Sequence, residues 1–426
     1  MLDRTISPEI KNATEFDLNL KPYRLEKLDN GIEVYIIEAG TQEVMTLDLV
    51  FDAGNWYDTS PLVAAATNFL LKNGTKEKTA YQINEHFEYY GSFLNRNCYN
   101  ETSTITLHTP SKHLSELLPV IAEIMTESVF PEEELAIYKQ NMKQRLEVNL
   151  KKCDVVASRL IDAAVFGEHH PYGIYSSKEQ YDSLTREDIV EFYKRYYLNG
   201  RCRIFAAGVL PADFKDQLNN YFGSLTLSSN PLQTIEHAYS PSKEKRYRII
   251  NDPNGVQGAV RLARPFPNRQ HPDFPKVQLL NTLFGGYFGS RLMSNIREDK
   301  GYTYGIHSYI QNHIGETAWM VSTEAGREVC EATIQEVYKE MEILRNEEID
   351  EEELQLVRNY ILGSTLGDLD GPFHILARWK NLILNGLTDE YFYRSLRIIK
   401  ETTAEELQAL AKKYLQPEDF YEMIVI

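Results

Sequence analysis

The sequence predicts an α+β protein made of two similar domains in tandem, and three observations support this prediction. At 426 residues the chain is too long for one typical hydrophobic core. One set of helix-start signals and strand-like runs occurs twice in the same order. Within each half, strand-like runs are followed by long helical runs, which is typical of sheets covered on one face by helices.

An internal repeat is the strongest organisational signal. The letters EEEL open a predicted helix at residue 132 and again at residue 351, a shift of 351 − 132 = 219. Capping boxes begin at Thr185 and Thr403, a shift of 403 − 185 = 218. In such a box, the threonine hydroxyl and an acidic side chain three residues later bind free amides of the first helical turn. A helix ending in two basic residues and a tyrosine follows each box, then a β-like run, so the offsets indicate a duplication.

Periodicity places individual elements in both halves. Alternation predicts strands at residues 103–108 and 302–310, and helical spacing predicts helices at residues 111–127, 131–151, 326–346 and 351–366. A polar stretch without clear periodicity, residues 226–245, is the expected linker. The predicted organisation is therefore a lead segment (1–23), an N-terminal domain (24–225), this linker, and a C-terminal domain (246–426).

Composition and charge narrow the classes of function. The formal net charge of −17 argues against a general nucleic-acid binder, which needs a basic surface. The charge suits a protein that attracts basic peptides, although acidity is common among soluble proteins. The scattered cysteines (Cys98, Cys153, Cys202, Cys330) form no CxxC motif, so neither a disulfide framework nor a zinc knuckle is expected. Residues 1–18 lack a signal-peptide core and no long apolar run follows, which favours a cytoplasmic protein without a membrane partner.

Several segments together resemble the pitrilysin-type peptidases, the inverzincin family that includes insulysin and the mitochondrial processing peptidase. The most specific match is FGGYFGSRLMSNIREDKGYTYGIHS (284–308), which is similar to the family's SRL, LRE and G-x-x-Y signature. Gly, Arg and Tyr keep the family's spacing in this segment. The resemblance covers nearly the whole chain from about residue 24, with further matches at residues 28–38, 51–58, 73–75, 89–107 and 166–208.

The resemblance implies two domains that face each other around a chamber. Each would hold a mixed, mostly antiparallel sheet covered on one face by helices, as in the LuxS and processing-peptidase metallohydrolases. Zinc would sit on the first domain, and an Arg and a Tyr of the second would hold substrate near the metal. Small members of this length usually work as pairs of chains. In some pairs one chain carries the zinc motif and the other carries the Arg/Tyr pair.

The family's zinc motif, His-x-x-Glu-His, is predicted to be degenerate in this chain. Its ligand and base positions fall on Ala65, Asn68 and Phe69. The chemistry needs two histidines on one helix face, a further carboxylate ligand, and a glutamate base toward the metal-bound water. A methyl group and a phenyl ring cannot bind zinc, and a carboxamide cannot take a proton from water. Family spacing places the third ligand near Glu147, at 147 − 65 = 82, but a surface glutamate on an amphipathic helix is an equal interpretation.

No other histidine pattern predicts a replacement metal site. His169 and His170 are adjacent before a proline, and neighbouring side chains usually point apart in regular structure. His108 and His113 straddle a predicted strand end, which gives no ligand geometry. The chain contains neither HxxEH nor HExxH. We therefore expect no metal or other cofactor in this chain, and zinc in a partner.

Arg297 and Tyr304 are the predicted substrate-binding pair. A helix would end near Arg297, Gly301 would make the turn, and Tyr304 would lie on the next strand. Both side chains donate hydrogen bonds at neutral pH, which suits a peptide carbonyl or the oxyanion formed when water attacks it. Without the family match, a salt bridge for the arginine and a core position for the tyrosine would be the simpler interpretation.

Asn95 and Arg96 fall where family members pair an edge strand with extended substrate. The family prefers a small residue after the asparagine, so the bulky Arg96 weighs against peptide binding at this strand.

The sequence thus predicts a non-catalytic, substrate-positioning subunit of a heterodimeric zinc peptidase. Its expected partner is a homologous chain that contains HxxEH, and its expected substrates are peptides. Two alternatives stay open: a structural or interaction subunit comparable to the core proteins of respiratory complexes, and a peptidase with an unorthodox metal site that uses His169 or His170.

Overall fold

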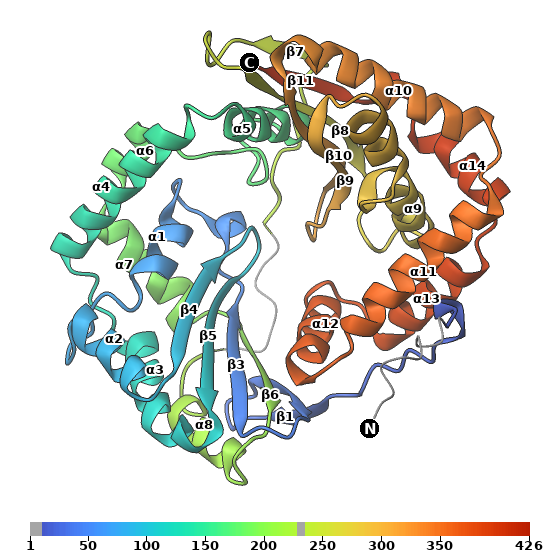
Figure 1. Cartoon of the computed structure of the whole chain (residues 1–426). Helices are drawn as coiled ribbons and strands as arrows, with labels where there is room; N and C mark the ends of the chain where they lie inside the picture. Colours follow the sequence, from blue (N-terminus) through green and yellow to red (C-terminus); the bar gives the residue numbers. More distant parts are fainter. Residues whose placement is uncertain (1–10, 228–234) are drawn as a thin grey trace, which may run out of the picture.

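The computed structural model describes residues 11–227 and 235–426, and each half of the chain forms one β-sheet with helices at the outer rim (Figure 1). The N-terminal sheet has the order β1-β2-β6-β3-β5-β4. Its strands are β1 (Arg24–Lys27), β2 (Glu33–Glu38), β3 (Val44–Phe51), β4 (Phe93–Cys98), β5 (Ser103–Pro110) and β6 (Cys202–Gly208). The C-terminal sheet has the order β7-β11-β8-β10-β9. Its strands are β7 (Arg246–Ile249), β8 (Gln257–Phe266), β9 (Thr303–Gln311), β10 (Thr317–Gly326) and β11 (Tyr421–Val425).

The two sheets share one topology. In each, a single parallel pair, β2 with β6 or β7 with β11, is followed by antiparallel neighbours. The series β2-β6-β3-β5-β4 therefore corresponds to β7-β11-β8-β10-β9, and β1 is an additional strand at one edge. This correspondence confirms the predicted α+β class with two similar, mostly antiparallel sheets.

The helices follow the same order in both halves. The N-terminal half has α1 (Val63–Leu70), α2 (Ala80–Tyr89), α3 (Leu114–Glu127), α4 (Glu132–Asn149), α5 (Cys153–Phe166), α6 (Lys178–Ser183), α7 (Arg186–Tyr193) and α8 (Phe214–Phe222). The C-terminal half has α9 (Phe274–Asn281), α10 (Cys330–Asn346), α11 (Glu351–Gly367), α12 (Pro372–Leu384), α13 (Asp389–Glu401) and α14 (Ala404–Tyr414). The four predicted helices correspond to α3, α4, α10 and α11, with ends shifted by a few residues. Both capping boxes form, since the Asp188 and Glu406 amides donate to Thr185 and Thr403 at 3.1 and 3.3 Å.

One helix of each half covers the sheet of the other half. Helix α5 packs against β8 and β11, and α12 packs against β2 and β6 (Figure 1). The two helices begin 372 − 153 = 219 residues apart, the same shift as the EEEL repeat. An ion pair between Lys380 of α12 and the buried Asp48 of β3 joins the halves at one contact. The sheets thus have their own helices on one face and a single exchanged helix on the other.

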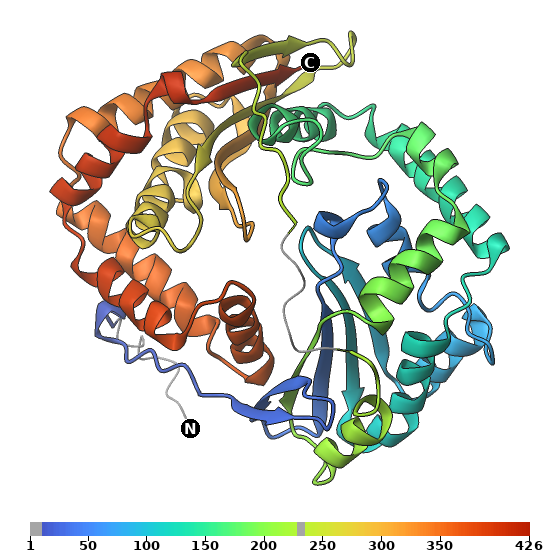
Figure 2. The same ribbon diagram turned by 180° about the vertical axis from the view of Figure 1, so that it is seen from behind.

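The described part of the predicted lead segment, residues 11–23, lies along the C-terminal half (Figure 2). The Ala13 amide donates to Asn359 of α11 at 3.1 Å, and the Leu20 amide donates to the Tyr393 hydroxyl of α13 at 3.2 Å. Both residues are buried together with Leu18. This segment therefore also holds the two halves together, because β1 follows it directly.

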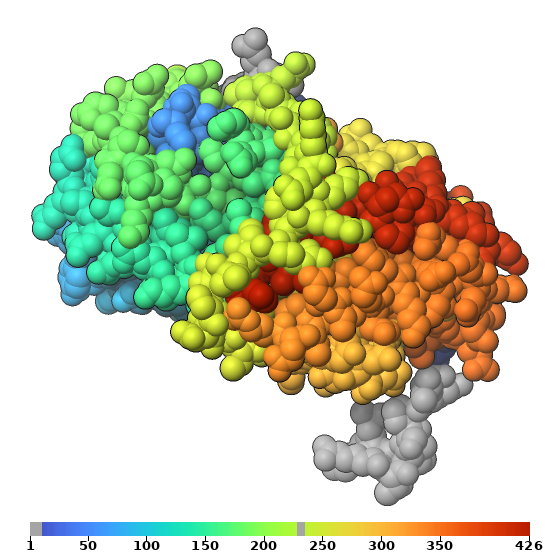
Figure 3. Space-filling model, turned by 90° about the horizontal axis from the view of Figure 1, so that it is seen from above, coloured from blue at the N-terminus to red at the C-terminus, as the bar shows by residue number. Residues whose placement is uncertain are grey.

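The connection between the halves crosses the seam on the surface shown in Figure 3. The Ser240 and Ser242 amides donate to carbonyls of Phe166 and Ala164 at the end of α5, at 3.3 and 2.8 Å. Residues 228–234 of the predicted linker lie outside the described residues.

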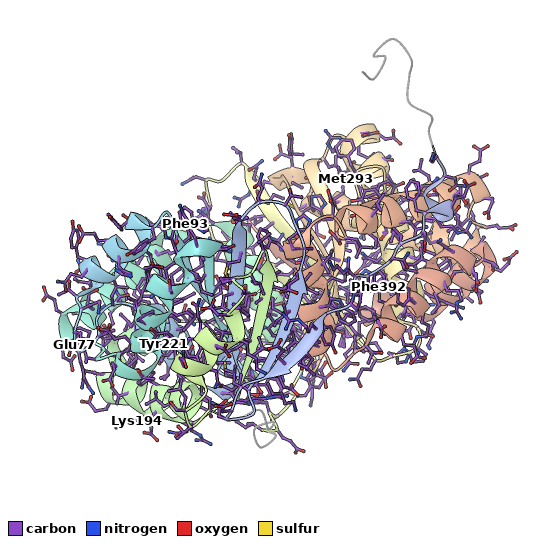
Figure 4. All side chains as sticks on the ribbon, turned by 90° about the horizontal axis from the view of Figure 1, so that it is seen from below. Glu77, Phe93, Lys194, Tyr221, Met293 and Phe392 are labelled. Atoms are coloured by element: carbon purple, nitrogen blue, oxygen red, sulfur yellow. The ribbon has the colours of Figure 1, made fainter. Side chains whose placement is uncertain are left out.

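Each half has its own hydrophobic core. One cluster fills the space between the N-terminal sheet and its helices, and a second fills the C-terminal half. A smaller third cluster lies between α5 and the C-terminal sheet. Figure 4 shows the side chains of both halves, with Phe93 on the N-terminal side and Met293 and Phe392 on the C-terminal side. Among the described residues, no helix is both long and apolar enough to cross a bilayer.

Candidate functional site

Helix α1 carries Ala65, Asn68 and Phe69, the positions that the sequence analysis assigned to a degenerate zinc motif. The helix begins after Leu62, whose φ of 74° is left-handed, and the Asp58 carboxylate accepts the Ala64 amide at 2.6 Å. Asp58 thus satisfies one of the free amides of the first turn. Ala65 faces a cavity, Asn68 is only 2% exposed, and Phe69 is partly exposed.

The side chains of Asn68 and Phe69 are both held by neighbours. Asn68 Nδ2 donates to the Tyr197 hydroxyl at 3.1 Å and to the Thr104 carbonyl at 3.4 Å. The Phe69 ring packs against Tyr138 with 4.9 Å between ring centres. A methyl group, a phenyl ring and a hydrogen-bonded carboxamide supply no pair of nitrogen or sulfur ligands, so these positions do not fit a zinc ion.

Arg96 lies directly over this helix. Its guanidinium stands 5.2 Å from the centre of the Phe69 ring and donates to the Phe69 carbonyl and, at 3.4 Å, to Asn73 Oδ1. Burial lowers the pKa of Arg96 to about 10, and its Nε is buried without a hydrogen-bond partner in the described chain. Arg96 therefore covers helix α1 at Phe69.

Strand β4 is an edge strand, as predicted, because among the described strands only β5 pairs with it. Asn95 is exposed on this strand. Lys72 Nζ lies 3.4 Å from the Leu94 carbonyl and donates to it. Burial, followed by repulsion from Arg96, lowers the pKa of Lys72 to about 8. A lysine side chain therefore contacts the backbone of this edge strand.

Glu147 lies on the exposed face of α4 and forms an ion pair with Lys178 of α6. The hydrogen bond and charge of Lys178 lower the pKa of Glu147. No hydrogen bond or ion pair within the described chain joins Glu147 to Ala65, Asn68 or Phe69. The structure therefore gives this residue the environment of a surface glutamate.

The histidines of the third hypothesis have separate environments. His170 is buried, its Nδ1 accepts the Tyr172 amide at 3.2 Å, and its ring packs on Phe166. His169 is exposed and borders the cavity next to Ala65. Within residues 11–227 and 235–426, no group of three or more His, Cys, Asp or Glu side chains is placed to hold a metal.

Arg297 and Tyr304 lie together at the start of β9. Arg297 belongs to a π-helical segment (Met293–Asp299), and Gly301, with φ of 66°, turns the chain into the strand. Such π-helical segments are frequent at functional sites. The Arg297 guanidinium is 5.8 Å from the centre of the Tyr304 ring. Tyr304 is 93% exposed, so the simpler interpretation of a core tyrosine is wrong.

The sequence analysis missed Phe288, which completes this group. Its ring lies 4.5 Å from the Arg297 guanidinium, the distance of a cation–π contact, and it is 63% exposed. The charged partner of Arg297 is the exposed neighbour Glu298, at 3.5 Å. The aromatic residue two positions before the SRL segment was the available signal.

The segment that carries Arg297 is fixed to α11 and α10. Arg291 forms two hydrogen bonds with Glu353 of α11, at 2.9 and 2.7 Å. Asn295 donates to Glu340 and Glu336 of α10 at 2.7 and 3.0 Å. A bidentate arginine–carboxylate pair adds geometric specificity as well as energy. The donors Arg297 and Tyr304 are therefore carried on a rigid support.

Comparison with known families agrees with the two-half architecture. The model described as insulinase (peptidase family M16) matches residues 33–176, and the model described as peptidase M16 inactive domain matches residues 183–361. The chain belongs to the M16 (insulinase) peptidase family and carries both of its domains. This finding confirms the resemblance to insulysin-type peptidases at the level of the family.

Individual relatives are distant. A protein named as an uncharacterized zinc protease of Bacillus subtilis is 22% identical over 362 residues, 84% of this chain and 87% of that protein. Bovine mitochondrial cytochrome b-c1 complex subunit 1 is 25% identical over 271 residues, 62% of this chain and 55% of that protein. A solved structure described as a peptidase M16 inactive domain from Pseudomonas fluorescens has a TM-score of 0.83 at 24% identity and covers 95% of this chain and 98% of that one. That structural likeness shows the fold.

Proposed function

We propose that this chain is the substrate-positioning subunit of a two-chain zinc peptidase. It would present Arg297 and Tyr304 to a peptide held at the zinc of a partner chain that contains HxxEH. The observation that carries this proposal is the 93% exposure of Tyr304 beside Arg297, whose own segment is fixed to α11 by the Arg291–Glu353 pair. Because the Tyr304 side chain is almost fully exposed, its hydroxyl can donate a hydrogen bond to another molecule next to the Arg297 guanidinium.

The two donors suit the charge that develops during peptide hydrolysis. In the partner, zinc would supply the activated water. The guanidinium and the phenol would donate to the carbonyl oxygen of the scissile bond, which becomes an oxyanion when water attacks. Donors aimed at that oxygen lower the barrier because they are already oriented when the charge forms.

A division of labour between two chains is supported by the contrast within this one. The positions for a metal and a base are occupied by Ala65, Asn68 and Phe69, whereas the donor pair is retained. The chain would therefore contribute substrate binding and oxyanion stabilisation, and the partner would contribute the metal and the base.

The test is to express a co-encoded M16 chain with HxxEH, then assay peptide hydrolysis by each chain alone and by the mixture. We expect activity in the mixture and none in this chain alone. Tyr304→Phe should lower the kcat of the mixture about 10²- to 10³-fold, the usual loss for one oxyanion donor. Tyr89→Phe is the matched control, because Tyr89 is also strongly exposed, at 81%, but lies on α2. Hydrolysis by this chain alone, or an unaffected Tyr304→Phe mixture, contradicts the proposal.

A second candidate function is a structural subunit without a role in proteolysis. The similarity to a cytochrome b-c1 complex subunit favours it. It predicts a stable complex with another protein whose formation is unaffected by Tyr304→Phe, and no gain of peptidase activity in any mixture. Size-exclusion chromatography of the mixture together with the peptidase assay separates the two functions.

A further inference from the structure

A cavity of about 440 Å³ lies where the two halves meet. Asp58 and Ala65 border it from the start of α1, Asp162 from α5, and Gln311 and His313 from the end of β9 and the turn after it. Its volume is in the range of small-molecule sites in proteins. Gln311 is seven residues along β9 from Tyr304, roughly 23 Å at the rise of a strand, so the cavity is separate from the donor pair.

Two carboxyl groups stand on the cavity wall, and the Arg159 guanidinium stacks on Tyr175, one of the lining residues. The lining contains the carboxyl groups of Asp58 and Asp162, and none of its described residues is a lysine or an arginine. Asp58 has no ion pair within the described chain; its contacts are with backbone amides of α1. Because burial has no cation to offset it, the pKa of Asp58 is raised to about 7.

Asp162 is held in place by neutral donors. It is 8% exposed, and it accepts hydrogen bonds from the Tyr175 hydroxyl and, at 3.0 Å, from Gln311 Nε2. Burial raises its pKa, and the charge of Arg261 from β8 offsets this in part. The acceptor oxygen of the same amide, Gln311 Oε1, is buried without a hydrogen-bond partner in the described chain. Gln311 thus leaves one acceptor oxygen beside Asp162 unpaired within the described chain.

Aromatic rings complete the lining. Tyr172 borders the cavity and stacks on His313 with 3.9 Å between ring centres. Burial, followed by the charge of His170, lowers the pKa of His313 to about 4, so this ring is neutral at pH 7. Carboxylates attract organic cations by charge and by charge-assisted hydrogen bonds. An anion would meet two carboxyl groups there, and an apolar ligand would bury them unpaired.

We propose that this cavity binds a guanidinium or ammonium group, carried either by a basic side chain of a peptide or by a free small amine. The inference does not depend on a zinc-bearing partner, because every residue that it uses belongs to this chain. Asp58 also has a structural role, because it accepts backbone amides at the start of α1. Asp58→Asn separates the two roles, since asparagine also caps helices but carries no charge.

Calorimetric titration of the full chain with three probes tests the ligand class. The probes are agmatine, the blocked peptide acetyl-Gly-Arg-Gly-amide, and the same peptide with citrulline, which keeps the shape of arginine without its charge. We expect at least one charged probe to bind, and the citrulline peptide to bind about tenfold more weakly or worse. Binding of the arginine peptide alone identifies a peptide side chain, and binding of agmatine alone identifies a free amine. Equal binding of the arginine and citrulline peptides, or no binding of either charged probe, overturns the proposal.

Variants locate the binding. Asp58→Asn should weaken the charged probes about tenfold or more, whereas Asp182→Asn, an exposed carboxylate paired with Lys143, should leave them unchanged. Ala65→Leu, which adds three carbons to the wall, should also weaken binding without removing any charge. If both Asp58→Asn and Ala65→Leu leave the affinity for the charged probes unchanged, the probes do not bind in this cavity and the proposal is overturned.

The pH dependence adds a readout that a capping role alone would not change. A guanidinium stays charged between pH 6 and pH 8, so any change in affinity with pH comes from groups of the protein. Asp58 is protonated below a pKa of about 7, and affinity for agmatine should therefore rise between pH 6 and pH 8. His169, His237 and Asp162 also face the cavity, and the slope that remains in Asp58→Asn measures their part. An undiminished slope in that variant contradicts the role of Asp58.

Discussion

The edge strands β4 and β9 hold equivalent positions in the two sheets, but their surroundings differ. Beside β4, Arg96 donates to the Phe69 carbonyl of α1, and Lys72 donates to the Leu94 carbonyl of the strand. Asn68 is buried and donates to the Tyr197 hydroxyl. Beside β9, Tyr304 projects into solvent next to Arg297 and Phe288. Packed side chains cover the edge of the sheet in one copy of the fold, and exposed hydrogen-bond donors stand at the equivalent edge in the other. The comparison teaches that equivalent edges of a duplicated fold can be covered in one copy and exposed in the other.

The largest expected effect concerns the helices exchanged between the halves. Lys380→Met leaves Asp48 buried without its cation and should lower the free energy of unfolding by about 3 kcal/mol. Arg378→Met, on the same helix, removes a more exposed pair with Asp368 and should cost about 1 kcal/mol or less. Urea unfolding of both variants measures the difference. Equal losses would show that α12 is not anchored through Asp48.

The next prediction tests whether Asn68 of α1 contributes to the stability of the fold. Asn68→Leu removes the donor to the Tyr197 hydroxyl and the Thr104 carbonyl, and should lower the free energy of unfolding by about 1–3 kcal/mol. Tyr304→Phe, in the other half, should change it by no more than about 0.5 kcal/mol, because the side chain is exposed. If the two substitutions lower the free energy of unfolding equally, the contrast between the packed Asn68 and the exposed Tyr304 is wrong.

A pH effect is expected from Asp58. Its pKa is raised to about 7 in the folded protein, above the value of a free carboxyl, so the folded state holds this proton more tightly than the unfolded state. The corresponding stability is present below about pH 4 and is lost as the pH rises to about 7. Asp58→Asn should remove this loss. Melting temperatures of both proteins at pH 5 and pH 8 measure it, and parallel shifts would refute the assignment.

The smallest effect is expected at Glu147. This side chain is exposed and pairs only with Lys178 in the described chain, so Glu147→Gln should leave the unfolding midpoint unchanged. It should also leave the zinc content of the purified chain unchanged, as measured by atomic absorption. A drop in bound zinc in the variant would show that Glu147 is a zinc ligand, and the N-terminal half would then hold a metal.

The sequence predicted the parts of this molecule that local signals encode. Capping boxes at Thr185 and Thr403, the EEEL repeat and strand alternation each depend on residues close together in the chain, and the fold class followed from their order. The exchange of α5 and α12 was not predicted, because no local signal says which sheet an amphipathic helix will cover.

The site was predicted in part for the same reason. The spacing from Arg297 to Tyr304 is local, and the structure places the two side chains together. Phe288 lies near them in sequence, but its contact with Arg297 depends on how the glycine-rich turn folds back. The cavity is formed by five separate segments of both halves, so its charge could not be read from any one of them.

The central claim is that the donors of this chain act at a metal held by another. The most direct measurement is the single-turnover hydrolysis rate of a zinc-bearing partner mixed with this chain or with its Arg297→Met, Tyr304→Phe double variant. The account predicts a rate at least about 10²-fold lower with the double variant, with unchanged complex formation. An equal rate with both forms would contradict it.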